Sequence, residues 1–366
     1  MSLSRCTIDG VRNLRQVELD ELAAANVFYG ANGSGKTSIL EAVHLLGMAR
    51  SFRGQSVKSL INHDMPQCTV FGEIEVENKR TMPLGVQRRR DGDALIRVAG
   101  ETVRTLAKLA EHLPLQVLNA GSFDLLTGSP TARRQYLDWG VFHVEHRFYE
   151  QWQRFQRCIK QRNNLLRHGK MSSHEIAVWS RELALAGQSV DRYRADYFSR
   201  LLPLFFEILG LLAPGLPTVE MRYRSGWERG KSYEEALDAS LTTDLEQGYT
   251  HVGPQRADIR VLQGKHAAAD ILSRGQQKLV VCALKLAQGR LLEENSGRIC
   301  TYLVDDLPSE LDREHCGQVC AQLADQDSQV FITSVEAADL RALWPGGSDN
   351  LAMFHVEHGR VLRDEC

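Results

Sequence analysis

The sequence has no excess of charge of either sign: 44 Lys and Arg residues stand against 46 Asp and Glu residues, a formal net charge of −2. A polyanionic partner would therefore have to meet a local basic patch, because the field of the whole molecule provides no attraction. Low-complexity tracts are also missing. A content of 43% hydrophobic and 25% charged residues is typical of an ordinary soluble globular protein.

Long apolar runs are scarce as well. The most apolar window, LLPLFFEILGLLAPGL (201–216), is shorter than the roughly 20 residues that a membrane-spanning helix needs, and it contains Glu207, Pro203 and Pro214. It predicts a core helix that ends at a proline, and it argues against a membrane protein. The first stretch, MSLSRCTIDG, has no apolar run after Arg5, which argues against a signal peptide.

The eight cysteines show no disulfide rhythm. Cys316 and Cys320 are the one close pair, on one face of an expected helix, and no second pair completes a zinc site. Free, partly buried thiols in a reducing cytosol are the expected state, so the sequence indicates a cytoplasmic protein.

Length and local pattern divide the chain. A chain of 366 residues should form about two domains, or one domain with a large insertion. Strand-like and helical segments alternate near both ends, with a hairpin signal at Asp91–Gly92, whereas the middle of the chain is mainly helical in its periodicity. An α/β fold with a helical insertion is therefore predicted. Its expected domains are 1–128, 129–250 and 251–366.

The clearest motif is the glycine-rich stretch YGANGSGKTS (29–38), which matches G-x-x-x-x-G-K-[ST] between an expected strand and an expected helix. Glycines let backbone N–H groups turn inward, and the start of the following helix favours an anion. Lys36 should neutralise phosphate oxygens, and the Thr37 hydroxyl should ligate Mg²⁺. The candidate phosphate-binding residues are Gly30, Ala31, Asn32, Gly33, Ser34, Gly35, Lys36, Thr37 and Ser38.

A phosphate loop alone does not distinguish kinases, GTPases and ATPases. The stretch TYLVDD predicts a buried strand that ends in two carboxylates. Asp305 is the expected Mg²⁺ ligand together with Thr37, and Asp306 is expected to orient or deprotonate the attacking water. No Asn-Lys-x-Asp motif for guanine occurs in the sequence, which argues against a GTPase.

A second glycine-containing stretch, LSRGQQK (272–278), predicts the start of a helix with Ser273 as its N-cap and an anion site at its N-terminus. A rigid helix start cannot fold back onto the phosphate loop of its own chain. A symmetric dimer, in which each subunit offers this stretch to the nucleotide of the other, resolves the difficulty. The expected γ-phosphate contacts are Ser273, Arg274, Gly275 and Gln276, and the expected catalytic groups are Lys36, Asp305, Asp306 and Ser273.

These motifs, with SELD (309–312), resemble the phosphate loop, signature, Walker B and D-loop of ABC-type ATPase heads. Within that superfamily the chain resembles the RecF family over nearly its full length. The similar stretches are LEAVHLLGMARSFR (40–53), SPTARRQYLD (129–138) and GPQRAD (253–258). The resemblance implies an SMC-like head without a long coiled coil, in which a mixed sheet with a small antiparallel β subdomain carries a helical insertion lobe.

The same resemblance implies a function. It implies ATP and Mg²⁺ as cofactors, an ATP-dependent homodimer, slow ATP hydrolysis, and binding of double-stranded and gapped DNA. It also implies RecR and RecO as mediator partners, RecA loading onto gapped single strands, and support of the SOS response. Asp306 is shorter than the glutamate of transporter-type heads, which fits slow hydrolysis. The switch position after VFIT carries Ser334 and Val335 instead of a histidine.

The segment 133–170 is a candidate DNA-binding arm, with nine Lys and Arg residues, Lys170 included, against three acids. Basic residues and amides on a helix suit sequence-independent phosphate contacts, and a solvated helix face is the alternative interpretation. The expected DNA contacts are Arg133, Arg134, Arg154, Arg157, Lys160 and Arg162. For a second basic cluster, QRRRD (87–91), DNA contact and an exposed tip both stay open.

Two other classes share part of the pattern. The nucleotide-binding subunit of an ABC transporter has the same loop, signature and Walker B, but it would usually have a switch histidine, two adjacent signature glycines and a much shorter helical insert. A nucleotide or small-molecule kinase would leave LSRGQQK and SELD unexplained.

Overall fold

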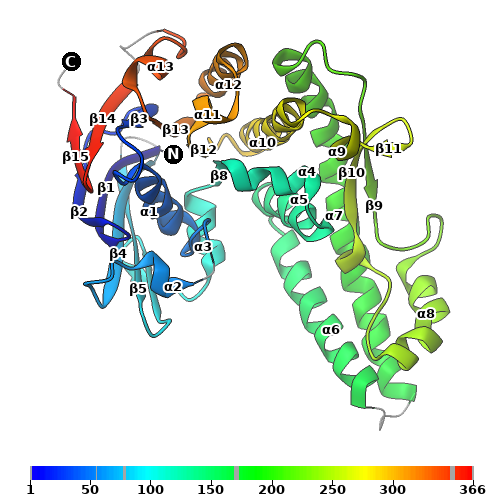
Figure 1. Cartoon of the computed structure of the whole chain (residues 1–366). Helices are drawn as coiled ribbons and strands as arrows, with labels where there is room; N and C mark the ends of the chain where they lie inside the picture. Colours follow the sequence, from blue (N-terminus) through cyan, green and yellow to red (C-terminus); the bar gives the residue numbers. More distant parts are fainter. Residues whose placement is uncertain (1, 55, 77–79, 169–172, 347–350, 365–366) are drawn as a thin grey trace. The chain divides into compact units, whose positions relative to one another are not determined.

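The computed structural model describes residues 2–54, 56–76, 80–168, 173–346 and 351–364. They belong to two compact units. Figure 1 colours the chain along the sequence, from blue at the N-terminus to red at the C-terminus. The head unit comprises Met1–Ser122, Ile208–Pro214 and Lys278–Cys366, and the insert unit comprises Phe123–Glu207 and Gly215–Gln277. The insert unit extends beyond the domain boundary expected after residue 250. The strand at 258–263 pairs with a strand of the insert unit, and this unit ends at Gln277.

The head unit contains a largely parallel sheet in the strand order β15-β14-β3-β13-β12-β8. Only β15 runs antiparallel to its described neighbour. All six residues of β13 are buried, as expected for a parallel strand that is covered on both faces. The carboxyl ends of β3, β12 and β13 share one edge, where ligands bind in open α/β sheets. The strands are β3 (Ala25–Tyr29), β8 (Leu115–Leu118), β12 (Thr301–Val304), β13 (Gln329–Ser334), β14 (Leu351–Glu357) and β15 (Arg360–Arg363).

A second sheet of the head unit is antiparallel throughout, in the order β2-β1-β4-β5-β6-β7. The hairpin expected near Asp91–Gly92 is confirmed between β5 and β6, and Gly92 has the positive φ of 103° that its turn requires. The strands are β1 (Ser2–Val11), β2 (Leu14–Leu19), β4 (Gln67–Val76), β5 (Arg80–Arg89), β6 (Ala94–Val98) and β7 (Glu101–Thr102).

Helix α1 (Lys36–Met48) joins the two sheets into one core. It contacts β1, β4 and β5 of the antiparallel sheet and β8, β12 and β13 of the parallel sheet, and nearly all its residues are buried (Figure 1). Two glycines permit this close packing. A Cβ on Gly47 would meet Leu115 at 2.3 Å, and one on Gly72 would meet Leu46 at 2.5 Å. Burial on every side extends to polar residues of this helix, because Ser38, Glu41 and His44 are buried together with its apolar residues.

Short helices complete the head unit. Cys316 and Cys320, on the second of the helices that follow β12, are free and buried, as expected for structural thiols. The helices are α2 (Val57–Leu60), α3 (Leu106–His112), α11 (Leu307–Glu310), α12 (Arg313–Asp325) and α13 (Ala337–Arg341).

The insert unit is mainly helical, as predicted, and carries a three-stranded antiparallel sheet in the order β11-β10-β9. No helix in the described part of the chain has both the length and the hydropathy of a membrane span. Helix α8 was not predicted, although Ser232 and Glu235 form a full capping box at its start. The elements are α4 (Asp124–Thr127), α5 (Pro130–Val144), α6 (Phe148–His168), α7 (Ser173–Leu212), β9 (Glu220–Arg224), α8 (Tyr233–Gln247), β10 (Asp258–Gln263), β11 (His266–Ala267), α9 (Ala268–Ile271) and the start of α10 (Arg274–Ser296).

A buried ion pair fastens α6 to α8. Arg162 and Asp244 are both 0% exposed, and Arg162 Nη1 lies 2.7 Å from Asp244 Oδ2. Thr250 and Ser180 accept further hydrogen bonds from the same guanidinium, at 2.8 and 2.9 Å. The other carboxylate oxygen of Asp244 accepts the main-chain N–H of His251 at 3.0 Å. Arg162 is therefore a structural residue of the core of the insert unit.

We expect Asp244→Ala to destabilise the insert unit by about 3–5 kcal/mol, because it leaves the Arg162 charge buried without a partner. Arg157→Ala, on the exposed side of the same helix, should stay within about 0.5 kcal/mol of the wild type. Urea unfolding followed by far-UV circular dichroism measures both changes. Equal stability of the two variants would show that the ion pair contributes nothing to the free energy of unfolding.

Candidate functional site

The phosphate loop lies where the sequence placed it, between β3 and α1 at the edge of the parallel sheet. Gly30, Gly33 and Gly35 have φ values of 145°, 81° and 124°, which residues with a Cβ rarely adopt. A Cβ on Gly30 would also meet the carbonyl oxygen of Val356 at 2.2 Å. The glycines of the motif are thus required by the backbone itself.

Lys36 extends back over the loop. Its Nζ donates to the carbonyl oxygens of Gly30 and Ala31 at 2.6 and 2.9 Å. Burial lowers the pKa of Lys36, and the nearby carboxylates of Asp306 and Asp305 oppose that effect. A phosphate beside Nζ would restore the solvation that the ammonium group has lost, so the position suits an anionic ligand.

The two expected Mg²⁺ ligands lie together at the ends of α1 and β12. Thr37 Oγ1 donates to Asp305 Oδ1 at 2.9 Å. A hydroxyl and a carboxylate are oxygen ligands of the kind that Mg²⁺ prefers, so these residues fit the metal that the phosphate loop implies. Asp306 follows in the left-handed conformation, with φ 54° and ψ 47°.

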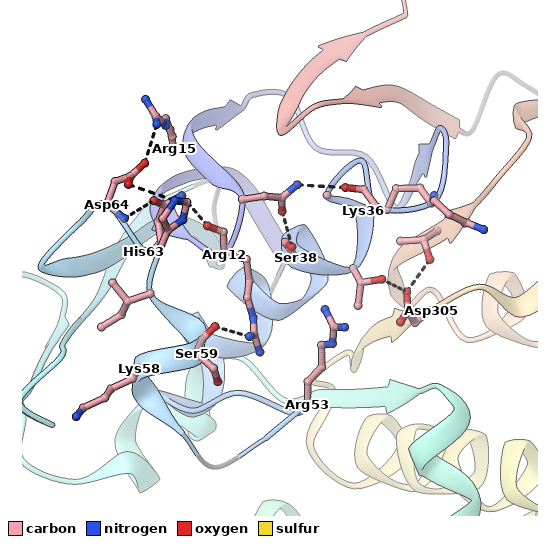
Figure 2. A pocket seen from close by; sticks show the side chains of 18 of the residues that line it. Arg12, Arg15, Lys36, Ser38, Arg53, Lys58, Ser59, His63, Asp64 and Asp305 are labelled. Carbon is pink, nitrogen blue, oxygen red and sulfur yellow. Dashed lines mark hydrogen bonds and ion pairs between the residues drawn. The ribbon is translucent and has the colours of Figure 1, made fainter.

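The loop and the carboxylates line one cavity of about 780 Å³. Figure 2 shows Lys36 and Asp305 at one end of this cavity and Arg15, His63 and Asp64 toward the other. The sequence motifs did not identify this second end. Its basic residues come from the β1–β2 turn and from the region around α2, which lie far from the motif along the chain. They are Arg12, Arg15, Arg53, Lys58 and His63.

The β1–β2 turn also supports the phosphate loop directly. Asn13 Nδ2 donates to the carbonyl of Ser34 at 3.1 Å, and Asn13 Oδ1 accepts from the Ser38 hydroxyl at 2.9 Å. Beside it, the Arg12 guanidinium binds both carboxylate oxygens of Glu41 on α1, each at 2.8 Å. That hydrogen bond raises the pKa of Arg12. Asn13 was missed because its role depends on a contact across 25 residues of sequence.

The signature stretch begins α10 as predicted. Ser273 is the N-cap, since its Oγ accepts the N–H of Gln276 at 3.3 Å while Gln276 Oε1 accepts the N–H of Ser273 at 2.9 Å. Ser273, Arg274 and Gly275 are exposed. A Cβ on Gly275 would meet nothing within 4 Å, so packing within the described chain does not require a glycine there. The exposed start of α10 therefore has open space around Gly275.

The structure removes some of the predicted residues from the candidate DNA-binding arm. The prediction that Arg162 contacts DNA is wrong, because its side chain is buried against Asp244. Arg133 is 15% exposed and its charge is balanced by Asp258 at 2.6 Å, so it too serves the fold. Arg134 donates to the carbonyl of Ala257 at 3.1 Å.

The exposed side of α6 keeps the basic character of the arm. Arg154 is half-exposed and pairs with Glu182, whereas Arg157 and Lys160 are exposed. After Glu150 the helix contains no acid. Lys170 lies outside the described residues. We define the α6 outer face as its exposed polar residues: Gln153, Gln156, Arg157, Lys160, Gln161 and Arg167.

Fold and site together define an ABC-type ATPase head of the SMC kind. The chain belongs to the RecF/RecN/SMC N-terminal domain family, whose model matches residues 2–360.

Curated relatives match almost the whole chain. It is 50% identical over 363 residues to the DNA replication and repair protein RecF of Stutzerimonas stutzeri, covering 99% of this chain and 98% of the relative. It is 51% identical over 363 residues to the protein of the same name from Azotobacter vinelandii, with 99% of each chain covered.

Solved structures agree on the fold. A structure described as the recombination mediator protein RecF with ATP in the RecFOR pathway superposes with a TM-score of 0.87 at 24% identity, over 99% of this chain and 97% of that one. An Smc head bound to the C-terminal winged-helix domain of ScpA superposes with a TM-score of 0.60 at 15% identity, over 100% and 98% of the two chains.

We expect Lys36→Ala to weaken ATP binding on the order of 100-fold, because two charge-assisted bonds to phosphate are lost. Lys36→Arg should still bind ATP but fail to hydrolyse it, since the planar guanidinium cannot take the place of the ammonium group. Titration with a fluorescent ATP analogue and a phosphate-release assay separate the two effects. Wild-type turnover by the Arg variant would mean that the lysine serves only as an anchor.

Proposed function

We propose that this protein is an ATP-dependent DNA-binding protein of recombinational repair and replication. It binds ATP and Mg²⁺ at the phosphate loop, dimerises on double-stranded DNA and hydrolyses ATP slowly. The observation that carries the proposal is the exposed start of α10. There, Ser273 caps the helix and Gly275 has open space around it, so this helix start is accessible to a phosphate group.

Dimerisation follows from how the two halves of the site are built. The phosphate loop holds a nucleotide by its own backbone and by Lys36, but the γ-phosphate needs a further donor to drive closure. The start of α10 provides a hydroxyl, main-chain N–H groups and the positive end of a helix dipole. In a homodimer with two-fold symmetry each subunit offers this helix start to the nucleotide of the other, so two equal sites form at once.

The chemistry of hydrolysis rests on three groups. Thr37 and Asp305 would hold Mg²⁺, and the bound ion would supply positive charge against the phosphates of ATP. Asp306 orients the attacking water or accepts its proton. Its side chain is shorter than that of a glutamate, which agrees with slow turnover.

DNA binding is assigned to the α6 outer face. It combines exposed cations with amides and, after Glu150, has no acid to repel phosphates. The relatives named DNA replication and repair proteins support a role on DNA, and the structure described as a recombination mediator in the RecFOR pathway supports mediator partners, for which we propose RecR and RecO. Double-stranded and gapped DNA as the substrate rests on the family resemblance. We extend this to RecA loading onto gapped single strands, to the SOS response and to a cytoplasmic location, on the family resemblance alone.

The alternative of a transporter subunit has less support. Helices α5, α6 and α7 make an insert far larger than that class usually carries. Full-length relatives with a repair name point the same way.

We expect reversal of Arg157, Lys160 and Arg167 to Glu to weaken duplex binding and to flatten its salt dependence by roughly one unit of log–log slope per lost phosphate contact. ATP binding should survive, because the substitutions lie outside the head unit. A charge-matched control reverses the exposed Arg222, Arg224 and Arg229, and it should keep the wild-type slope. Equal slopes for all three proteins would assign the α6 outer face to solvent or to a protein partner.

Mixing two inactive variants tests the shared site. We expect Lys36→Ala to leave its site largely empty at an ATP concentration that fills the wild type, and Ser273→Arg to bind ATP without allowing the dimer to close. A heterodimer of the two contains one doubly broken site and one fully wild-type site, so mixing should restore up to about half of the ATPase activity per mixed dimer.

Sizing is the control. Light scattering must show that the wild type changes from monomer to dimer with ATP and duplex DNA, and that the mixed dimer forms. A wild-type protein that never dimerises would sink the mechanism. So would a mixed dimer that forms without any recovery while the wild type is active.

A further inference from the structure

Thr333, the second-to-last residue of β13, carries a hydroxyl that hydrogen-bonds to both candidate carboxylate residues. Thr333 is 0% exposed. Its Oγ1 accepts the main-chain N–H of Asp306 at 2.8 Å and donates to Asp305 Oδ1 at 2.9 Å. A hydroxyl has one proton, and the N–H of Asp306 can only donate. The direction of both bonds is therefore fixed, and the Thr333 hydroxyl donates its hydrogen bond to Asp305.

Asp306 depends on this contact more than an ordinary residue would. Its left-handed backbone, φ 54° and ψ 47°, costs on the order of 1 kcal/mol or more in a residue with a Cβ and persists only where the surroundings impose it. The bond from its N–H to Thr333 is one such restraint. Asp306 is also the N-cap residue of α11, so its backbone sets where the short helix begins.

Asp305 is restrained from two sides. Thr37 and Thr333 both donate to its Oδ1 at 2.9 Å, one from the first turn of α1 and one from the end of β13. Two hydroxyl donors on one oxygen fix the rotation of the carboxylate. A carboxylate held in one rotation presents its other oxygen in a fixed direction, as an oxygen ligand for a metal ion requires.

We propose that Thr333 is the positioning residue of the site, which holds Asp305 in place for the metal ion and Asp306 in place for the attacking water. The proposal rests on the proposed ATPase function and adds a residue that no sequence motif contains. Thr333 binds neither phosphate nor metal itself. It acts through the two carboxylate residues, and its hydroxyl is the part of the side chain that matters.

The same sheet provides a matched comparison. Thr301 on β12 is 1% exposed, and its Oγ1 has no hydrogen-bond partner among the described residues. A buried threonine on a neighbouring strand thus contributes no hydrogen bond of its side chain. Thr→Val at 301 and at 333 removes the same atoms at nearly equal volume, but only the change at 333 breaks bonds to the carboxylate residues.

The experiment compares the wild type with Thr333→Val, Thr333→Ser and Thr301→Val. Removing a hydrogen bond to a charged group should lower kcat of Thr333→Val about 10- to 100-fold, with KM for ATP within about threefold. A second readout is independent of turnover. The Mg²⁺ concentration for half of the ATP-dependent rise in melting temperature should increase about tenfold, while ATP affinity in EDTA stays within about twofold. Thr333→Ser keeps the hydroxyl and should restore both values, and Thr301→Val should match the wild type.

Each outcome decides the matter. If Thr333→Val keeps the wild-type kcat and Mg²⁺ midpoint, or if Thr301→Val changes them as much, the positioning role is wrong while the ATPase proposal stands. A wild type that binds no ATP would overturn the proposed function, and this inference with it. If Thr333→Val shifts the Mg²⁺ midpoint and Thr333→Ser restores it, the hydroxyl is established as the positioning group.

Discussion

The packing of α1 between two sheets is the constraint on which the head unit depends. A helix that is buried on every side has a position that the parallel sheet and the antiparallel sheet decide together. The phosphate loop leads into its first turn and inherits that position. Two turns then fix the loop, one from each sheet. Asn13 of the β1–β2 turn binds Ser34 and Ser38, and the N–H of Gly359, between β14 and β15, donates to the carbonyl of Ser34 at 2.8 Å.

The electrostatics of the site follow from the same packing. Lys36 extends back over the carbonyls of its own loop, and the two aspartates directly follow β12, which β13 separates from β3. Beyond the loop, a wall of Arg and Lys side chains continues along the cavity. Some of these cations are paired with carboxylates, Arg12 with Glu41 and Arg15 with Asp64, so their positions are fixed by the protein itself.

Local signals in the sequence predicted the parts of the site that a single segment can build. The glycine loop needs its positive φ angles, Asp305 and Asp306 follow a buried strand, and Ser273 caps a helix. A few neighbouring residues are enough to predict each of these features. The sequence did not predict Asn13, Arg12 or Thr333, because their roles arise only when distant strands become neighbours. The prediction that Arg162 contacts DNA was wrong for a related reason. Its helix could be predicted from periodicity, but which side of that helix meets Asp244 depends on the arrangement of α6 and α8.

The cap of α10 joins two demands in a single oxygen atom. The Ser273 Oγ already accepts the N–H of Gln276, and its own proton is still available for a donor bond. Capping of the helix and the phosphate contact that we propose for Ser273 therefore do not compete for this side chain. An aspartate would cap the helix equally well but would repel the anion, and an alanine would satisfy neither need. Only a small hydroxyl side chain meets both needs at position 273, even though the residue lies on the surface.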